Sequence, residues 1–168
     1  MLENTGKTLL TDKDKQLIRI QIDAELEIRS RLGTTFERFT NNIRPSFVFH
    51  KHNKILGDAL DRVRSGEIKR LMVFEAPRHG KTEQCSRLFP PYYLFNNPTH
   101  HFGIMSYSAD LAFGISRDAR DNYLATGRKL SGSAEGMIEW HTSSGGRCWS
   151  AGVGGAITGK GFHIGLID

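Results

Sequence analysis

A pattern of strand, tight loop and helix at residues 71–82 constrains the fold more than any other part of this sequence. The apolar run 71–74 leads into residues 75–82, Glu-Ala-Pro-Arg-His-Gly-Lys-Thr, and a segment with helical spacing follows. Backbone N–H groups at the start of such a helix favour an anion. The Lys81 ammonium suits the β- and γ-phosphates of a nucleotide, and the Thr82 hydroxyl suits Mg²⁺. The pattern therefore predicts a phosphate-binding loop with ATP and Mg²⁺ as its ligands.

The loop departs from the common motif at one position, because Glu75 stands where that motif has its first glycine. A Gly-Lys-Thr that starts a helix without binding phosphate is the alternative interpretation. The preceding apolar run and a second motif near residue 168 favour the nucleotide site. The predicted ATP-binding residues are Pro77, Arg78, His79, Gly80, Lys81 and Thr82.

Composition indicates a globular domain with a modest basic bias. The chain has 168 residues, of which 38% are hydrophobic and 24% charged, enough for one domain with its own core. No apolar run is long enough for a membrane span, and we expect no membrane partner. The net charge of +5 is compatible with nucleic acid as a partner, although an ordinary solvated surface would give the same value. Cys85 and Cys148 are expected to be reduced and buried.

Residues 1–66 are predicted to form an N-terminal helical segment, and residues 67–168 the core. The first helix should run from Thr11 to Gly33 with one apolar face, which we expect to pack on the core, although packing on a partner is the alternative. A second should open at Thr34 and end near residue 41. A third should be capped by Asn53 and stop at Gly66.

Residues 44–52 alternate aromatic and basic side chains, and three interpretations remain open. Phe47 and Phe49 could simply pack into the core. Phe47 and His50 could instead form an adenine pocket, since a flat base needs an apolar face and a nearby hydrogen-bonding group. The third interpretation is a nucleic-acid contact.

Alternating strand and helix patterns in the core predict an α/β fold, a three-layer sandwich whose mostly parallel sheet is flanked by helices. Residues 70–75 are predicted as the first central strand, with a helix from Lys81 that stops before Pro90. The remaining expected elements follow in order: strand 102–107, a helix capped by Ser108, a surface loop at 128–136, a hairpin of 137–142 and 147–151, and strand 162–168.

The C-terminal region supplies the second half of the predicted site. Residues 152–161 contain five glycines, which favours a loop that closely approaches phosphate or DNA, although a tight crossover would use the same residues. A strand then ends in Asp168. In P-loop proteins a carboxylate at the end of a neighbouring strand holds Mg²⁺, so Thr82 and Asp168 are the predicted metal ligands.

From about residue 34 to its end, the sequence resembles the N-terminal ATPase domain of the large terminase subunit of tailed phages. The matching positions are Phe36, Phe39, Pro45, Phe47, His50, His52, residues 64–67, 70–71 and 76–82, residues 106–112 and 116–120, and the Gly-Gly-x-x-Thr-Gly-x-Gly run at 154–161.

This resemblance implies a motor that hydrolyses ATP to move double-stranded DNA into a procapsid. It also implies a homo-oligomeric ring, a portal protein and a small terminase subunit as partners, and the cytoplasm of a bacterial host as location. Catalytic roles carry over to Lys81, Arg78 and Asp168, with Arg78 contacting the nucleotide phosphates. The family's inter-subunit arginine finger has no clear match, and Lys160 is the nearest basic candidate for a trans or DNA contact.

The family also has an acidic residue directly after the position of Asp168 and a separate nuclease domain farther along. We therefore interpret this sequence as a truncated part of such a protein, which should bind ATP with little turnover. A fragment of a helicase-like nucleic-acid translocase is one alternative, because it would share both nucleotide motifs. A non-catalytic remnant that binds DNA or protein is another.

Overall fold

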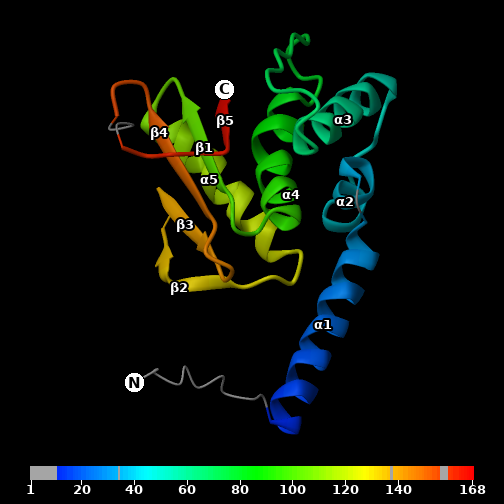
Figure 1. Cartoon of the computed structure of the whole chain (residues 1–168). Coiled ribbons are helices and arrows are strands. Elements are labelled where there is room, and N and C mark those ends of the chain that lie inside the picture. Colours follow the sequence, from blue (N-terminus) through cyan, green and yellow to red (C-terminus); the bar gives the residue numbers. More distant parts are fainter. Residues whose placement is uncertain (1–10, 34, 137, 156–158) are drawn as a thin grey trace.

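The computed structural model describes residues 11–33, 35–136, 138–155 and 159–168. Its fold is α/β, with helices packed on one face of a five-stranded mixed sheet (Figure 1). The elements in chain order are α1 (Asp12–Leu32), α2 (Phe36–Ile43), α3 (Lys51–Arg64), the π-helix η1 (Glu83–Leu88), α4 (Phe89–Asn96), β1 (His101–Ser106), α5 (Ala109–Leu124), β2 (Leu130–Glu135), β3 (Glu139–Thr142), β4 (Arg147–Gly152) and β5 (Ile164–Ile167). No helix among these described parts is long and apolar enough to cross a bilayer.

The sheet has the strand order β2-β3-β4-β1-β5. Strand β1 pairs in parallel with both β4 and β5, whereas β3 pairs antiparallel with β2 and β4. The expected mostly parallel sheet is therefore corrected to a mixed one. The antiparallel part consists of the predicted hairpin, which is confirmed, and of β2, which lies where a surface loop was expected. Residues of that Gly/Ser-rich stretch pair with β3 through an irregular register, a role that their composition does not indicate.

The strand register shows which side chains lie on each face of the sheet. Phe102 and Trp140 both align with Cys148, so all three lie on one face. There Phe102 meets Phe89 of α4 at a ring distance of 6.0 Å, and Trp140 packs on α5. The opposite face carries Trp149, which packs on Phe162 from the segment before β5. Helices α4 and α5 thus cover one face, and the chain entering β5 lies on the other.

Helix α4 continues through the position where the helix after the loop was expected to stop. Pro90 and Pro91 lie in its first turn, directly after the π-helix η1, and neither donates a backbone N–H to the turn before it. The π-helix η1 precedes them, so the chain from Lys81 to Asn96 is helical throughout. The prediction that Ser108 caps the next helix is confirmed, since its hydroxyl accepts a hydrogen bond from Leu111 N at 3.2 Å.

The predicted central strand at residues 70–75 is wrong for the described structure. Residues 71–76 form neither helix nor strand, and Met72 and Phe74 are 78% and 84% exposed. Within the described chain, β5 is an edge strand and pairs only with β1. An apolar run becomes a strand only when a neighbour completes its backbone hydrogen bonds, and none of the described strands does so here.

The N-terminal helices and the sheet share one hydrophobic core. Phe36 and Phe39 of α2 both pack on Tyr92 of α4, with ring centroids 5.6 and 5.2 Å apart. Asp61 of α3 accepts hydrogen bonds from Phe36 N and from the Tyr92 hydroxyl, joining the three helices. The cap predicted at Thr34 lies outside the described residues.

Helix α1 differs from expectation along most of its length. Only its C-terminal end reaches the core, through Ile28 and the buried Leu32. The preceding turns extend away from the rest of the molecule (Figure 1). One ion pair, between Glu25 and Arg128, links them to the chain that leaves α5. Amphipathic spacing correctly predicts the helix but not what its apolar side chains contact.

Two glycine substitutions test the sheet packing. A Cβ added at Gly103 would lie 2.7 Å from Cζ2 of the buried Trp149, whereas a Cβ at Gly114 in α5 would meet open space. We expect Gly103→Ala to lower the free energy of unfolding by about 1–3 kcal/mol through overpacking. Gly114→Ala should raise it by about 0.5–1 kcal/mol, because alanine favours the helix. Urea denaturation followed by circular dichroism measures both, and equal effects of the two would contradict this packing.

Candidate functional site

The predicted phosphate-binding loop forms a turn between an irregular segment and a helix. Residues 77–80 turn, and helical structure begins at Lys81, with Gln84 N donating to Gly80 O at 2.9 Å. Gly80 has a φ of 91°, and Arg78 has a φ of 66°, the one positive value at a non-glycine residue within the described chain. Holding a side-chain-bearing residue there costs of order 1–3 kcal/mol, and such conformations gather at functional sites.

The N-terminal end of α3 holds one side of this loop. His79 O accepts hydrogen bonds from Asn53 Nδ2 at 3.2 Å and from His52 Nε2 at 3.3 Å. The prediction that Asn53 is the N-cap of this helix is corrected, because α3 begins at Lys51 with His50 at its N-cap; the Oδ1 atom of Asn53, the third helical residue, accepts from His50 N at 3.1 Å. The sequence did not indicate that Asn53 would also bind the loop. The one indication in the sequence was the residue type, because an Asn side-chain amide can donate one hydrogen bond and accept another at the same time.

Lys81 and Thr82 occupy the first helical positions after the loop and are partly exposed. Their side chains therefore lie beside the first backbone N–H groups of the helix, which have no partner within it. Ammonium, hydroxyl and free N–H groups together are the donors that a chain of phosphates requires. The position of both residues at the start of the helix is as predicted, and their phosphate and Mg²⁺ roles stay predictions.

Asp168 lies at the C-terminal end of β5, next to the end of β1. Its backbone N–H donates to Met105 O at 2.9 Å, and its carbonyl accepts from the Ser106 hydroxyl at 3.2 Å. These bonds extend the β1–β5 ladder by one residue and fix the position of the backbone. The prediction that Asp168 directly follows a strand is confirmed.

The pKa of Cys85, on the first turn of η1, indicates which charged side chains lie near it. The pKa of its thiol is raised to about 12, mainly by burial and also by the negative charges of Glu75 and Asp168, whereas the charge of Lys81 lowers it. Coulombic effects of this kind fall off with distance, so all three charges lie near Cys85. Lys81 and Asp168 thus both lie near Cys85, although they are 87 positions apart in the sequence (168 − 81 = 87).

Two polar side chains at this place were not predicted. Glu75 has a buried carboxylate oxygen, and Gln84 is fully buried with both amide atoms lacking a hydrogen-bond partner among the described residues. Gln84 Nε2 would lie 3.9 Å from a Cβ added at Gly80, so its amide borders the loop. A buried group without a partner costs free energy and marks a position at which a ligand or a loop movement could supply one.

The side chains proposed for an adenine pocket are divided between the loop and the core. Phe47 would contact a Cβ at Gly80 at 3.8 Å, and its ring lies 5.0 Å from that of Phe49. Phe49 in turn packs on the core ring of Phe36. His50 precedes α3, and its ring stacks on His52 at 6.0 Å. Phe47 therefore borders the loop as an adenine contact would require, while Phe49 follows the core-packing interpretation.

Lys160 lies on the face of the sheet opposite the helices. Its ammonium is 3.3 Å from Glu139 Oε2 and stands over the Trp149 ring at 5.5 Å. Burial alone would raise the pKa of Glu139, but hydrogen bonds from His141 and Lys160 and the charges of Lys160 and Arg147 hold it below its usual value. Within this chain Lys160 thus has a carboxylate partner. Part of the preceding glycine-rich run, residues 156–158, lies outside the described residues.

The metal ligands predicted at this site are hard oxygen donors. A Thr82 hydroxyl and an Asp168 carboxylate suit Mg²⁺, which takes few protein ligands and keeps water or phosphate oxygens for the rest. No group of three or more His, Cys, Asp or Glu side chains that could hold a metal occurs in the described part of the chain. A two-ligand Mg²⁺ site completed by phosphate is compatible with that finding.

Comparison with known proteins gave no match among family models, curated proteins or solved structures.

Thiol reactivity of Cys85 tests the arrangement of charges without any ligand. At pH 8 we expect slow alkylation, because a raised pKa leaves little thiolate. Glu75→Gln and Asp168→Asn should each speed alkylation by at least about twofold, and Lys81→Ala should slow it, since like charges raise and opposite charges lower a thiol pKa. Mass spectrometry of iodoacetamide-treated protein measures the rate.

Asp23→Asn, on the distant and exposed part of α1, is the matched control and should change nothing. An Asp168→Asn rate equal to that of this control would mean that Asp168 is not near the loop.

Proposed function

We propose that this chain is the ATP·Mg²⁺-binding part of a DNA-packaging motor of the large terminase type. The observation that carries the proposal is that Lys81 and Asp168 both lie near Cys85, with Arg78 at a positive φ in the loop that precedes the helix. A basic side chain and a carboxylate that meet at a helix start are the protein's contribution to phosphoryl-transfer sites of the P-loop kind.

Each side chain has a defined role in this proposal. Backbone N–H groups at the start of the helix and the Lys81 ammonium bind the β- and γ-phosphates. Arg78, on the exposed side of the turn, contacts the phosphates, and Phe47 lies where the base would approach the loop. Thr82 and Asp168 would hold Mg²⁺, which when bound neutralises phosphate charge.

The loop's attachment to α3 supports preorganised binding. Since His79 O is engaged by Asn53 and His52, the neighbouring backbone cannot rotate freely, and less conformational freedom is lost when phosphate binds. Double-stranded DNA, a portal protein, a small subunit and a ring of like chains are the partners that follow from this proposal. The excess of basic residues is compatible with the first of them.

Titration with a fluorescent ATP analogue in the presence of Mg²⁺ tests the proposal. Lys81→Ala should weaken binding about tenfold or more, because it removes a charge-assisted contact of roughly 1.5–3 kcal/mol. Lys129→Ala removes an exposed lysine elsewhere and should bind as the wild type does. Asp168→Asn should bind the analogue with a weaker dependence on Mg²⁺.

A folded wild-type chain that binds no nucleotide would refute the proposal, and so would equal affinities of Lys81→Ala and Lys129→Ala. Circular dichroism of each variant separates loss of binding from loss of folding.

A further inference from the structure

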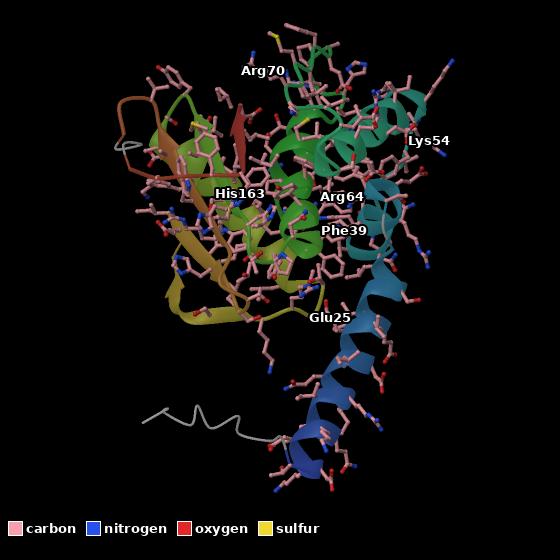
Figure 2. The ribbon with its side chains drawn as sticks, viewed as in Figure 1. Glu25, Phe39, Lys54, Arg64, Arg70 and His163 are labelled. Atoms are coloured by element: carbon pink, nitrogen blue, oxygen red, sulfur yellow. The ribbon has the colours of Figure 1, made fainter. Side chains whose placement is uncertain are left out.

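Helix α1 carries an apolar surface that the rest of the described chain does not cover. Five of its large apolar side chains are between 39% and 59% exposed: Leu17, Ile18, Ile20, Ile22 and Leu26. The helix is nevertheless held in place, since Leu32 is buried in the core and Glu25 is paired with Arg128 (Figure 2). Such a concentration of exposed aliphatic side chains on one fixed element marks an interaction surface.

The shape of this surface fits another helix. Ile18, Gln21, Ile22 and Glu25, together with Leu26, line a groove on α1. The first four occupy positions i, i+3, i+4 and i+7, which is the arrangement that receives one side chain from a facing helix in knobs-into-holes packing. A neighbouring helix that presents a Leu or Ile would fill the groove.

A row of charged residues beside this groove indicates which helix would pack against it. Lys15, Arg19, Asp23 and Glu27 follow one another at four-residue spacing, so they form a single ridge with two positive charges and then two negative ones. This ridge neighbours the apolar ridge of Ile18, Ile22 and Leu26. When a second copy of this helix runs in the opposite direction, the positive residues of each ridge face the negative residues of the other.

In an antiparallel pair of α1 helices, Lys15 of one copy would face Glu27 of the other, and Arg19 would face Asp23. A parallel pair would instead set like charges together, at a cost. Lys15 also contacts Asp12 of its own helix at 3.0 Å. That pair is highly exposed, and exposed pairs of this kind contribute little, so it does not hold Lys15 away from a second partner.

We propose that two copies of this chain associate through α1, with the helices antiparallel, the apolar ridges of Ile18, Ile22 and Leu26 packed together and the charge ridges paired end to end. The contact is isologous, as expected for a two-fold dimer. It is independent of the nucleotide site, so failure of either proposal leaves the other intact.

Sedimentation equilibrium of the whole chain tests the association. The wild type should show a concentration-dependent dimer, and Ile22→Glu should remain monomeric because it places a charge in the groove. Ile55→Glu is the matched control: Ile55 is a similarly exposed isoleucine on α3, and its variant should dimerise as the wild type does. A wild type that stays monomeric at the highest soluble concentration overturns the proposal, and so does equal behaviour of the two variants.

Charge variants test the pairing itself. The double variant Lys15→Glu, Arg19→Glu makes the ridge wholly acidic, and Asp23→Lys, Glu27→Lys makes it wholly basic. Each should be monomeric alone, and an equimolar mixture should form a heterodimer that high salt weakens. Since these side chains are on an exposed surface, far-UV circular dichroism should remain as in the wild type. Dimerisation of either double variant alone overturns the charge argument.

Orientation is tested with cysteines. Chains carrying Lys15→Cys and chains carrying Glu27→Cys, mixed under mild oxidation, should form a mixed disulfide between positions 15 and 27 if the helices are antiparallel. The wild type controls for reaction of Cys85. A 15–15 disulfide in preference to the mixed one would show a parallel pair and overturn the assignment.

Discussion

The packing of α4 on β1 determines where the candidate site is. Phe102 of β1 meets Phe89 at 6.0 Å and Tyr93 at 5.8 Å, and both of these belong to α4. Because η1 and α4 are continuous with the helix that starts at Lys81, this aromatic contact also fixes the position of the loop at residues 77–80, the predicted phosphate-binding loop. Strand β5 is the other neighbour of β1, so the same strand positions Asp168. Both halves of the site therefore depend on one buried strand.

Local features of the site could be predicted from sequence, because they depend on short-range chemistry. Gly80 and Lys81 are recognisable as a turn followed by a helix start, and Ser108 is recognisable as a cap. The contribution of Asn53 could not be predicted, since its bond to His79 O joins residues 26 positions apart. The continuation of the helix through Pro90 could not be predicted either, because a π-helical segment directly precedes both prolines and local sequence patterns do not indicate it.

The sheet was predicted less well, because a strand is defined by its neighbours. The apolar run at 71–74 has the composition of a central strand, yet its backbone pairs with none of the described strands and Phe74 is exposed. The Gly/Ser-rich stretch of β2 has the composition of a loop, yet it pairs with β3. In both cases tertiary pairing outweighs local preference, which is weak for strands and depends on context.

The same reasoning explains why α1 departed from expectation. An apolar period of 3.6 residues shows that a helix face must be covered, but it carries no information about what covers it. Core packing is the usual solution, and the last turn of α1 adopts it through Leu32. The earlier turns carry an additional signal that apolar spacing ignores, the reversal of charge between Arg19 and Asp23. A helix that packed only on its own core would not need this order of charges. In an antiparallel pair of α1 helices, each of the four charged residues of the ridge faces a residue of opposite sign.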